Sequence, residues 1–404
     1  MRSVTSAGNE PIRVLFCCTG VGIFNRGIET FFREAFEGLK SAEGIEARLI
    51  KGADDNSEFG IRNPEFSERV AWCLPRTGSL APLIGKLTGR SAYAVEQWSS
   101  FPAVVREIRR FRPHVVFTSE ANLMFLLRRF RRWIGVPFCV LYSNGGPVHP
   151  PFNRHDVVHQ VAPFYLEEAL QTGEPAGKHF LVPYGIHVPP PPVIDQAAKR
   201  ALHQKLGLPL DRPIVLSVGW IARQHKRMDY VIEEVARMAE PRPYLHLLGA
   251  MDEASSEILE LGNRVLGPEN FSAGSVPYQQ VTDYYRAADC FVLGSLKEGF
   301  GRVYLEALMH GLPTIGHRHP VIEWVLGDAG IVADLSQPGA LATALAEQLA
   351  LPASLRKAQM HQRWESVRSR FDWVMLRDSY AAMFRACAAQ VTPRVSAATF
   401  SPLH

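Results

Sequence analysis

The sequence lacks the features that mark membrane-spanning, secreted and nucleic-acid-binding proteins. No apolar run reaches the roughly 18 residues that a membrane-spanning helix requires, and the polar start of the chain lacks the apolar core of a signal peptide. The net charge is only +4 over 404 residues, so overall charge does not indicate nucleic acid as a partner. Low-complexity tracts and short repeats are absent too. We therefore expect a globular protein of the cytoplasm.

Cysteine is scarce, and its six positions show no spacing typical of a metal site. Cys17, Cys139 and Cys290 lie in apolar runs, where reduced and buried thiols are common. No Asp-x-Asp pattern occurs, since Asp54 and Asp55 are adjacent. We therefore expect neither disulfides nor a bound metal.

A chain of this length is too long for one hydrophobic core, so two domains are expected. Short apolar runs alternate with segments of helical periodicity, which predicts an α/β protein with parallel, doubly wound sheets. The runs expected to form strands lie at 12–18, 47–50, 115–117, 138–142, 214–219, 244–248, 290–293 and 313–315. The Val-Pro-Pro-Pro-Pro run at 188–192 cannot continue a sheet and predicts a semi-rigid spacer.

One segment of the second half carries most of the functional information. Glu298 precedes a Gly-Phe-Gly turn at 299–301, and Glu306 follows inside an expected helix. A strand, a glycine-rich turn and a helix start present backbone N–H groups that hold phosphate, and carboxylates beside them can accept hydrogen bonds from sugar hydroxyls. Two plainer interpretations stay open: Glu298 as a charge favoured by the helix dipole, and Glu306 as a solvated helix residue.

A basic cluster follows the first strand of that half. Gly219 closes the strand, and Arg223, His225, Lys226 and Arg227 precede the next helix. Fixed cations beside a helix N-terminus form an anion site, whereas a solvated basic loop is the alternative. Because cations there oppose the helix dipole, their presence favours phosphate binding. Such cations would neutralise a bound diphosphate, so no metal is required there.

The stretch from Tyr284 to Glu306 resembles the Glu-(seven residues)-Glu motif of retaining glycosyltransferases of the GT-B fold, in particular family four, also called glycosyltransferase group one. The resemblance covers most of the second half and, more weakly, the start of the first. It implies two Rossmann-like domains with a cleft between them. It also implies an enzyme without a cofactor that moves a sugar from a UDP- or GDP-sugar to a glycan or lipid-linked acceptor, with retention of configuration.

The resemblance also implies roles for single residues. Glu298 would contact the donor sugar, Glu306 would hold the ribose hydroxyls, and Lys226 would bind the diphosphate. Where the family has Arg after the glycine, this chain has Trp220, and Arg223 is the suggested replacement. The predicted catalytic residues are Glu298, Lys226, Arg223 and His149, and the predicted donor-binding residues are Glu306, Gly299, Phe300, Gly301, Gly22, Gly27, Asn144 and Glu323.

Residues of the first half match the family less closely. Of the family's paired glycines and following apolar-Glu pair, only Gly27 and Glu29 correspond here. In the loop after the 138–142 strand the family often has a His, where this chain has Asn144, with His149 and His155 further on. Either His is a candidate for substrate contact, and a surface position is the alternative for both.

The domains follow from the resemblance and the proline run. We expect an acceptor-side domain at 1–187, a hinge at 188–200, a nucleotide-sugar domain at 201–370, a helix crossing back at 371–390 and a frayed tail at 391–404. Residues 101–133 carry eight Arg against two Glu beside an apolar run. This composition suits an anionic membrane surface, although a core-facing helix with a solvated basic end is favoured.

The sequence leaves two alternative functions. Gly20-Val21-Gly22, with Asp54 and Asp55 further on, resembles the dinucleotide site of an NAD-type oxidoreductase. The third glycine of that fingerprint falls on Asn25, however, so the fingerprint fails. A degenerate, non-catalytic GT-B binding protein is the other alternative, and intact Glu298, Glu306 and Lys226 argue against it.

Overall fold

The computed structural model describes residues 10–24, 26–52, 67–145, 148–193 and 195–391. These residues form two compact units, each built around one parallel sheet. The first unit takes in the described residues of Met1–Val161, Tyr165–Gly185 and Leu376–His404, and the second takes in those of Ala162–Phe164 and Ile186–Met375. Asn25, Asp54, Asp55 and the predicted tail after Val391 lie outside the described residues.

The first unit contains a seven-stranded parallel sheet in the order β3-β2-β1-β4-β5-β6-β7. Its strands are β1 (Ile12–Cys17), β2 (Ile45–Gly52), β3 (Glu68–Ala71), β4 (Val115–Thr118), β5 (Cys139–Asn144), β6 (Val157–Gln160) and β7 (His179–Leu181). The helices mainly in this unit are α1 (Gly27–Leu39), α2 (Leu80–Thr88), α3 (Ala92–Phe111), α4 (Ala121–Arg129), α5 (Arg131–Ile134), α6 (Pro163–Gln171), the 3-10 helix η1 (Ala176–Lys178) and α15 (Trp373–Ala389).

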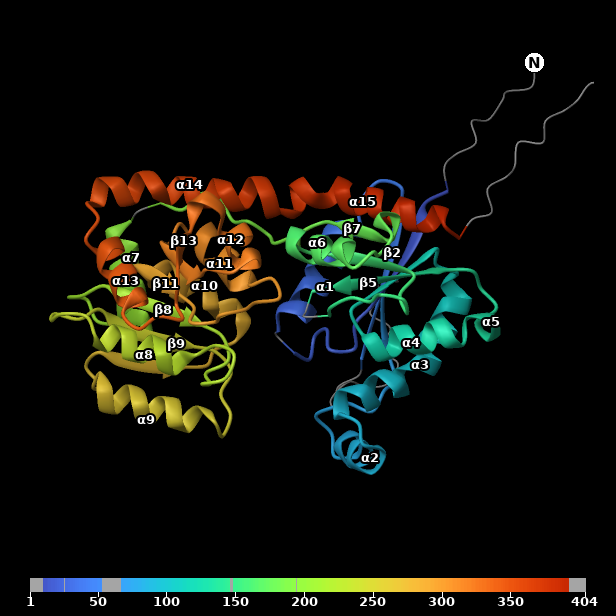
Figure 1. Ribbon diagram of the computed structural model, residues 1–404, viewed down its shortest axis with the longest axis horizontal. Coiled ribbons are helices and arrows are strands. Elements are labelled where there is room, and N and C mark those ends of the chain that lie inside the picture. Colours follow the sequence, from blue (N-terminus) through green and yellow to red (C-terminus); the bar gives the residue numbers. More distant parts are fainter. Residues whose placement is uncertain (1–9, 25, 53–66, 146–147, 194, 392–404) are drawn as a thin grey trace, which may run out of the picture. The chain divides into compact units, whose positions relative to one another are not determined.

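Alternate side chains of β1 face opposite helix layers, as expected for a strand buried on both sides. Phe16 makes edge-to-face contacts with Phe36 of α1 and Phe384 of α15. Leu15 and Cys17 instead join a buried cluster with apolar residues of α3 and α4. The last helix of the chain, shown in red in Figure 1, therefore completes one layer of the first unit.

The second unit contains a six-stranded parallel sheet in the order β10-β9-β8-β11-β12-β13. Its strands are β8 (Ile214–Val218), β9 (Tyr244–Leu248), β10 (Phe271–Gly274), β11 (Cys290–Val292), β12 (Thr314–His317) and β13 (Ile331–Ala333). Its helices are α7 (Gln196–Leu206), α8 (Met228–Ala236), α9 (Ser255–Val265), α10 (Tyr278–Ala287), α11 (Arg302–Met309), α12 (Pro320–Leu326), the 3-10 helix η2 (Gly327–Ala329), α13 (Ala340–Leu349) and α14 (Ala353–Phe371).

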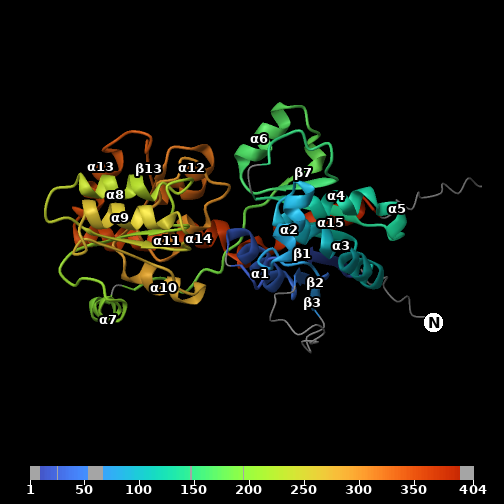
Figure 2. The same cartoon turned by 90° about the horizontal axis from the view of Figure 1, so that it is seen from below.

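Helices cover both faces of this second sheet. On one face α8 contacts α9 and α13, and on the other α10 contacts α7 (Figure 2). α7 begins inside the predicted 188–200 hinge, where Asp195 caps it by accepting from the backbone N–H of Ala198 at 3.0 Å. The proline run also packs, since the indole N–H of Trp364 donates to the carbonyl of Pro189 at 2.8 Å. That segment is thus only partly irregular.

Both sheets share one topology. In each unit the first strand lies between the second and the fourth, so the chain reverses its direction of progress beside that strand. Doubly wound sheets bind ligands beyond the carboxyl ends of the strands at this reversal. In the second unit the two strands concerned are β8 and β11. The predicted α/β class with two Rossmann-like domains is confirmed.

Candidate active site

Lys226 and Glu298 meet at the carboxyl-terminal edge of the second sheet. Lys226 lies in the loop between β8 and α8, and Glu298 lies in the loop between β11 and α11. Nζ of Lys226 donates to Oε1 of Glu298 at 2.6 Å, and the two side chains are 19% and 9% exposed. The two motifs selected separately in the sequence therefore form one site at the reversal of the strand order.

Two glycines make room for the lysine. A Cβ atom at Gly219 would lie 3.3 Å from Cδ of Lys226, so the lysine stem runs across the bare backbone of Gly219. A Cβ at Gly249 would lie 1.7 Å from the carbonyl oxygen of Gly219, a contact that no side chain allows. The role of Gly249 was not predicted. Its place directly after the predicted strand at 244–248 is the sequence feature that could have indicated it.

The Gly-Phe-Gly turn leads directly into α11. Gly301 precedes the helix with φ of 80°, and a Cβ there would lie 2.7 Å from the ring of Tyr304; both features require glycine. The Phe300 side chain is buried and makes edge-on contacts with Trp324 and Phe371. Only the backbone of Phe300 can therefore contact a ligand.

Glu306 is held in place by a tyrosine from another helix. Its Oε2 accepts a hydrogen bond from the hydroxyl of Tyr285 on α10 at 3.0 Å. Burial and the neighbouring Glu306 raise the pKa of Tyr285 well above its usual range, so the tyrosine remains a donor. Tyr285 lies within the stretch that resembles the family, but no pattern in the sequence indicated its role.

The other cations of the β8–α8 loop have different partners. Nη1 of Arg223 donates to Oδ2 of Asp229 in the first turn of α8 at 2.8 Å, and its side chain is largely exposed. Arg227 donates to the carbonyl oxygen of Gly294 at 3.2 Å. Lys226 thus pairs with the first carboxylate of the Glu-x7-Glu motif. The predicted role of Arg223 in binding diphosphate stays a prediction.

Glu323 lies exposed in the first turn of α12. His319 caps this helix because its Nδ1 accepts from the backbone N–H of Val321 at 3.3 Å. His319 therefore has a structural reason to be present. Contact between Glu323 and a donor stays a prediction.

The predicted residues Asn144, His149 and His155 of the first unit have different surroundings. Asn144 is buried at the end of β5, and its Nδ2 donates to the carbonyl of Val148 at 3.1 Å, which fixes the start of the loop. His149 is exposed, with Nδ1 2.9 Å from Oε1 of Glu168. Burial lowers the pKa of His155 to about 4, so its ring is neutral.

A cluster of three buried carboxylates, from Glu29, Glu96 and Glu120, lies beneath the loop after β1. Nη2 of Arg76 donates to Oε1 of Glu96 at 2.7 Å, and Nη1 lies 3.8 Å from Oε1 of Glu29. Oγ1 of Thr19 lies 2.6 Å from Oε1 of Glu96 and 2.5 Å from Oε1 of Glu120. Burial raises the pKa of Glu120 to about 7. This network was not predicted.

The glycines of the same loop differ in their environment. A Cβ at Gly20 would lie 2.6 Å from Oε1 of Glu29, so the loop rests directly on the carboxylate cluster. Gly22 has φ of 85° and open space around the position of a Cβ, and Gly27 is the first residue of α1. Gly22 and Gly27 as donor-binding residues stay predictions.

The part of the chain that holds Lys226 and Glu298 matches a known family. Residues 198–365 match the family described as glycosyl transferases group 1. This part of the chain is similar to the group 1 glycosyltransferases. The group 1 region contains Lys226, Glu298 and Glu306 together, and the match does not favour an NAD-type oxidoreductase.

Relatives of known name match part of the chain. The chain is 30% identical over 179 residues to the lipopolysaccharide core biosynthesis glycosyltransferase LpsE of Rhizobium meliloti, covering 44% of this chain and 51% of LpsE. It is 35% identical to the mannosylfructose-phosphate synthase of Agrobacterium fabrum, covering 40% of this chain and 37% of that protein. The chain thus spans about half or less of the length of these relatives.

Solved structures extend the likeness in fold to both units. The sucrose-phosphate synthase of Thermosynechococcus elongatus has a TM-score of 0.74 at 20% identity and covers 94% of this chain and 100% of its own. Anabaena Alr3699/HepE, solved in complex with UDP and glucose, has a TM-score of 0.69 at 16% identity and covers 93% and 100%. The chain has the GT-B fold of these neighbours. Among the residues described, no helix combines the length and the apolar character needed to cross a membrane.

Proposed function

We propose that the chain is a retaining glycosyltransferase that moves a sugar from a nucleotide-diphosphate donor to a glycan or lipid-linked acceptor. The observation that carries the proposal is the 2.6 Å contact between Lys226 and Glu298 inside the group 1 region. A cation and a carboxylate placed together at the strand reversal suit a ligand that carries both phosphate and sugar hydroxyls. Glu306, held by Tyr285, suits the ribose.

The chemistry follows from the charge that develops. The bond between the anomeric carbon and the diphosphate oxygen breaks, and its electron pair stays on that oxygen. Lys226 and the positive end of the α11 dipole stabilise this charge, with Arg223 as a further cation, so the reaction is proposed to be metal-independent. The acceptor oxygen bonds to the anomeric carbon on the same face, and its proton passes to the leaving phosphate. His149 and Asn144 remain candidates for contact with the sugar.

The donor nucleotide is proposed to be UDP or GDP. A UDP complex is known for the Anabaena neighbour, which shares the fold at low identity. Lipopolysaccharide core biosynthesis in the name of the Rhizobium relative suggests a glycan or lipid-linked acceptor, such as one used in polysaccharide assembly. No further cofactor is proposed.

A peripheral membrane contact through 101–133 is also proposed. Leu123, Met124 and Leu127 of this segment are buried, as the core-facing alternative expects. Phe125, Phe130 and Trp133 are exposed in contrast, and Trp133 is 62% exposed. Aromatic rings beside arginines favour the headgroup region of an anionic bilayer.

The test is a calorimetric titration of the whole chain with UDP, GDP and NADH in turn, followed by a donor-hydrolysis screen over UDP- and GDP-sugars. We expect one nucleoside diphosphate to bind and its sugar to be hydrolysed slowly. Binding of NADH alone would support an oxidoreductase instead. If no nucleotide binds, the chain is a degenerate GT-B protein.

A further inference from the structure

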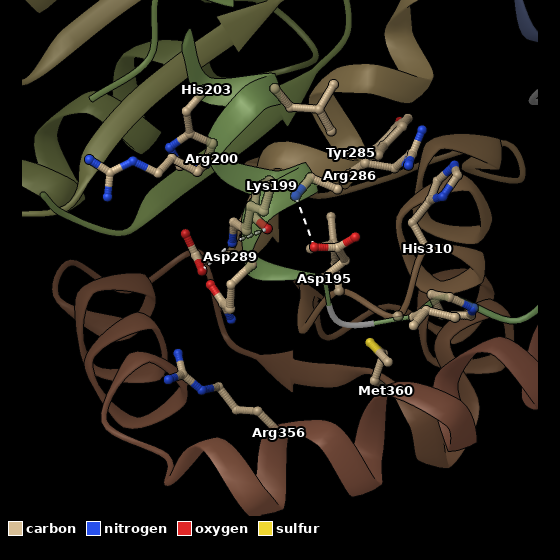
Figure 3. A pocket seen from close by; sticks show the side chains of 18 of the residues that line it. Asp195, Lys199, Arg200, His203, Tyr285, Arg286, Asp289, His310, Arg356 and Met360 are labelled. Atoms are coloured by element: carbon tan, nitrogen blue, oxygen red, sulfur yellow. Dashed lines mark hydrogen bonds and ion pairs between the residues drawn. The ribbon is translucent and has the colours of Figure 1, made fainter. Parts of the chain in front are cut away.

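An open cavity of about 1040 Å³ lies in the second unit, away from Lys226. Its walls come from α7, α10, α14 and the turns that directly precede β8, β11 and β12 (Figure 3). Since the strands of this sheet are parallel, these turns lie at the amino-terminal edge, whereas Lys226 and Glu298 follow β8 and β11 at the opposite edge. The cavity is therefore separate from the proposed donor site.

Arg363 of α14 lines this cavity as a buried cation with only neutral partners. It is 4% exposed, and its hydrogen bonds run from Nη1 to the carbonyl of Gly311 at 3.3 Å and from Nη2 to Oε1 of Gln359 at 2.8 Å. Its Nε has no partner within the described part of the chain. A buried charge is normally paired with an opposite charge, so this guanidinium has room for an anionic partner.

Further donors surround the same turn. His310 precedes Gly311, and its Nε2 also lacks a partner among residues that the structure describes. The His310 ring stacks on Tyr285 with 5.7 Å between centroids. Burial lowers the pKa of His310, and the nearby Arg286 lowers it further. Arg356 lines the cavity from α14, the helix that carries Arg363 (Figure 3).

The carboxylates in the walls are already engaged. Asp289 accepts from Lys199 at 2.6 Å and from the backbone of Ile214 at 2.9 Å. Asp211 pairs with the neighbouring Arg212 at 3.2 Å, and Asp195 caps α7. Arg286, Arg356 and Arg363 have no ion pair within the described residues, so the walls carry excess positive charge.

We propose that this cavity is a second ligand site, which takes a small soluble molecule bearing phosphate. Guanidinium groups bind phosphate through paired N–H donors, and Arg363 is already ordered by its bonds to Gly311 and Gln359. The proline wall at 189–192 and Met360 supply apolar surface for the rest of the molecule. The volume is at the upper end of the range for small-molecule sites, roughly 300–1,000 Å³.

The site is tested by titrating inorganic pyrophosphate into the full chain carrying Lys226→Ala, which weakens phosphate binding at the proposed donor site. We expect one saturable binding event in this variant. Adding Arg286→Ala and Arg356→Ala, both away from the core, should weaken that event at least tenfold. Lys357→Ala, on the same helix but outside the cavity lining, is the matched control and should change nothing.

The outcomes separate the two sites. The second site is overturned if the Lys226→Ala chain shows no saturable pyrophosphate binding. It is also overturned if adding Arg286→Ala and Arg356→Ala leaves that binding unchanged. Suppose that Lys226→Ala removes all pyrophosphate binding, and that Arg286→Ala with Arg356→Ala in the otherwise unchanged chain has no effect. This result supports the donor site and rejects the cavity. Sedimentation with phosphatidylglycerol vesicles distinguishes a lipid headgroup from a soluble ligand. Arg286→Ala with Arg356→Ala should leave vesicle binding unchanged. A loss of vesicle binding in this variant would overturn the assignment to a soluble ligand.

Discussion

Nζ of Lys226 lies 2.6 Å from Oε1 of Glu298, and the two residues are separated by 72 positions in the chain. In this pairing the carboxylate holds the ammonium group at the strand reversal. If a diphosphate bound Lys226 in its place, Glu298 would be able to accept hydrogen bonds from the hydroxyls of a sugar. The same contact orders both groups in the absence of the proposed donor.

Removing either partner should abolish turnover without unfolding the chain. We expect Lys226→Ala and Glu298→Ala each to lower kcat at least 100-fold, because loss of one stabilising donor or positioning group costs about 3 kcal/mol of transition-state stabilisation. Initial rates with the preferred sugar nucleotide and circular dichroism provide the measurement. Lys297→Ala is the control, since this neighbouring lysine is exposed. An active Lys226→Ala chain would remove Lys226 from the site.

Tyr285→Phe should weaken donor binding and leave kcat nearly unchanged. The substitution removes the hydroxyl that donates to Glu306 at 3.0 Å, and a hydrogen bond to a charged group contributes about 1.5–3 kcal/mol. We therefore expect KM for the sugar nucleotide to rise at least tenfold. Tyr284→Phe, the adjacent residue, serves as the control. An equal fall in kcat with unchanged KM would contradict the positioning role.

Gly249→Ala should destabilise the second unit strongly. Its Cβ would lie 1.7 Å from the carbonyl oxygen of Gly219, so β8 and β9 would have to separate locally, at a cost of about 3 kcal/mol or more. Gly177→Ala is the matched control, because nothing lies within 4 Å of that position. Hydrogen exchange of the β8 and β9 amides measures the effect. Equal protection in both variants would disprove the close contact.

The first unit should lose stability as the pH rises through about 7. Burial raises the pKa of Glu120 to about 7, so folding favours its protonated form; that stabilisation is complete below the pKa of the unfolded chain, about 4.5, and is lost as the pH passes the folded value. The single hydroxyl proton of Thr19 cannot serve both Glu96 and Glu120, which also favours a proton on one carboxyl.

Hydrogen exchange of the β1 and β4 amides between pH 5 and 8 tests this dependence. The full effect is on the order of 3 kcal/mol. Glu29, whose pKa burial also raises, contributes in the same direction. Glu120→Gln should flatten the profile, and a profile of unchanged slope in this variant would assign the dependence to other groups.

Membrane contact predicts a loss of vesicle binding when aromatic residues of 101–133 are removed. Phe125→Ala with Trp133→Ala should reduce co-sedimentation with phosphatidylglycerol vesicles several-fold, and the binding should weaken with salt. Leu210→Ala, an exposed apolar residue of the second unit, is the control. Equal binding by all variants would leave the core-facing interpretation of the segment.

The sequence predicts the fold well where strands are long enough to show a pattern. The strands of five to eight residues lie in the predicted apolar runs. The shorter β4, β11 and β12 were also predicted, because their residues belong to apolar runs. The strands β3, β6, β7, β10 and β13 have only three or four residues. So few residues cannot establish an alternation, and their pairing depends on neighbours distant in the chain.

The site shows the same division. Lys226 and Glu298 each lie in a local motif, and so each was predictable. The carboxylate cluster was not, because Thr19, Arg76, Glu96 and Glu120 come from separate elements that only the folded chain brings together. Tyr285 was missed for the same reason, since its partner is 21 residues away.

The last helix has a consequence for synthesis of the chain. Phe384 of α15 contacts Phe16 and Phe117, which lie in the first-unit strands β1 and β4. A ribosome makes those strands more than 250 residues before the helix that shields them. During synthesis the Phe384 contacts of these strands therefore form only after α15 has emerged, and a nascent chain stopped before position 373 lacks them.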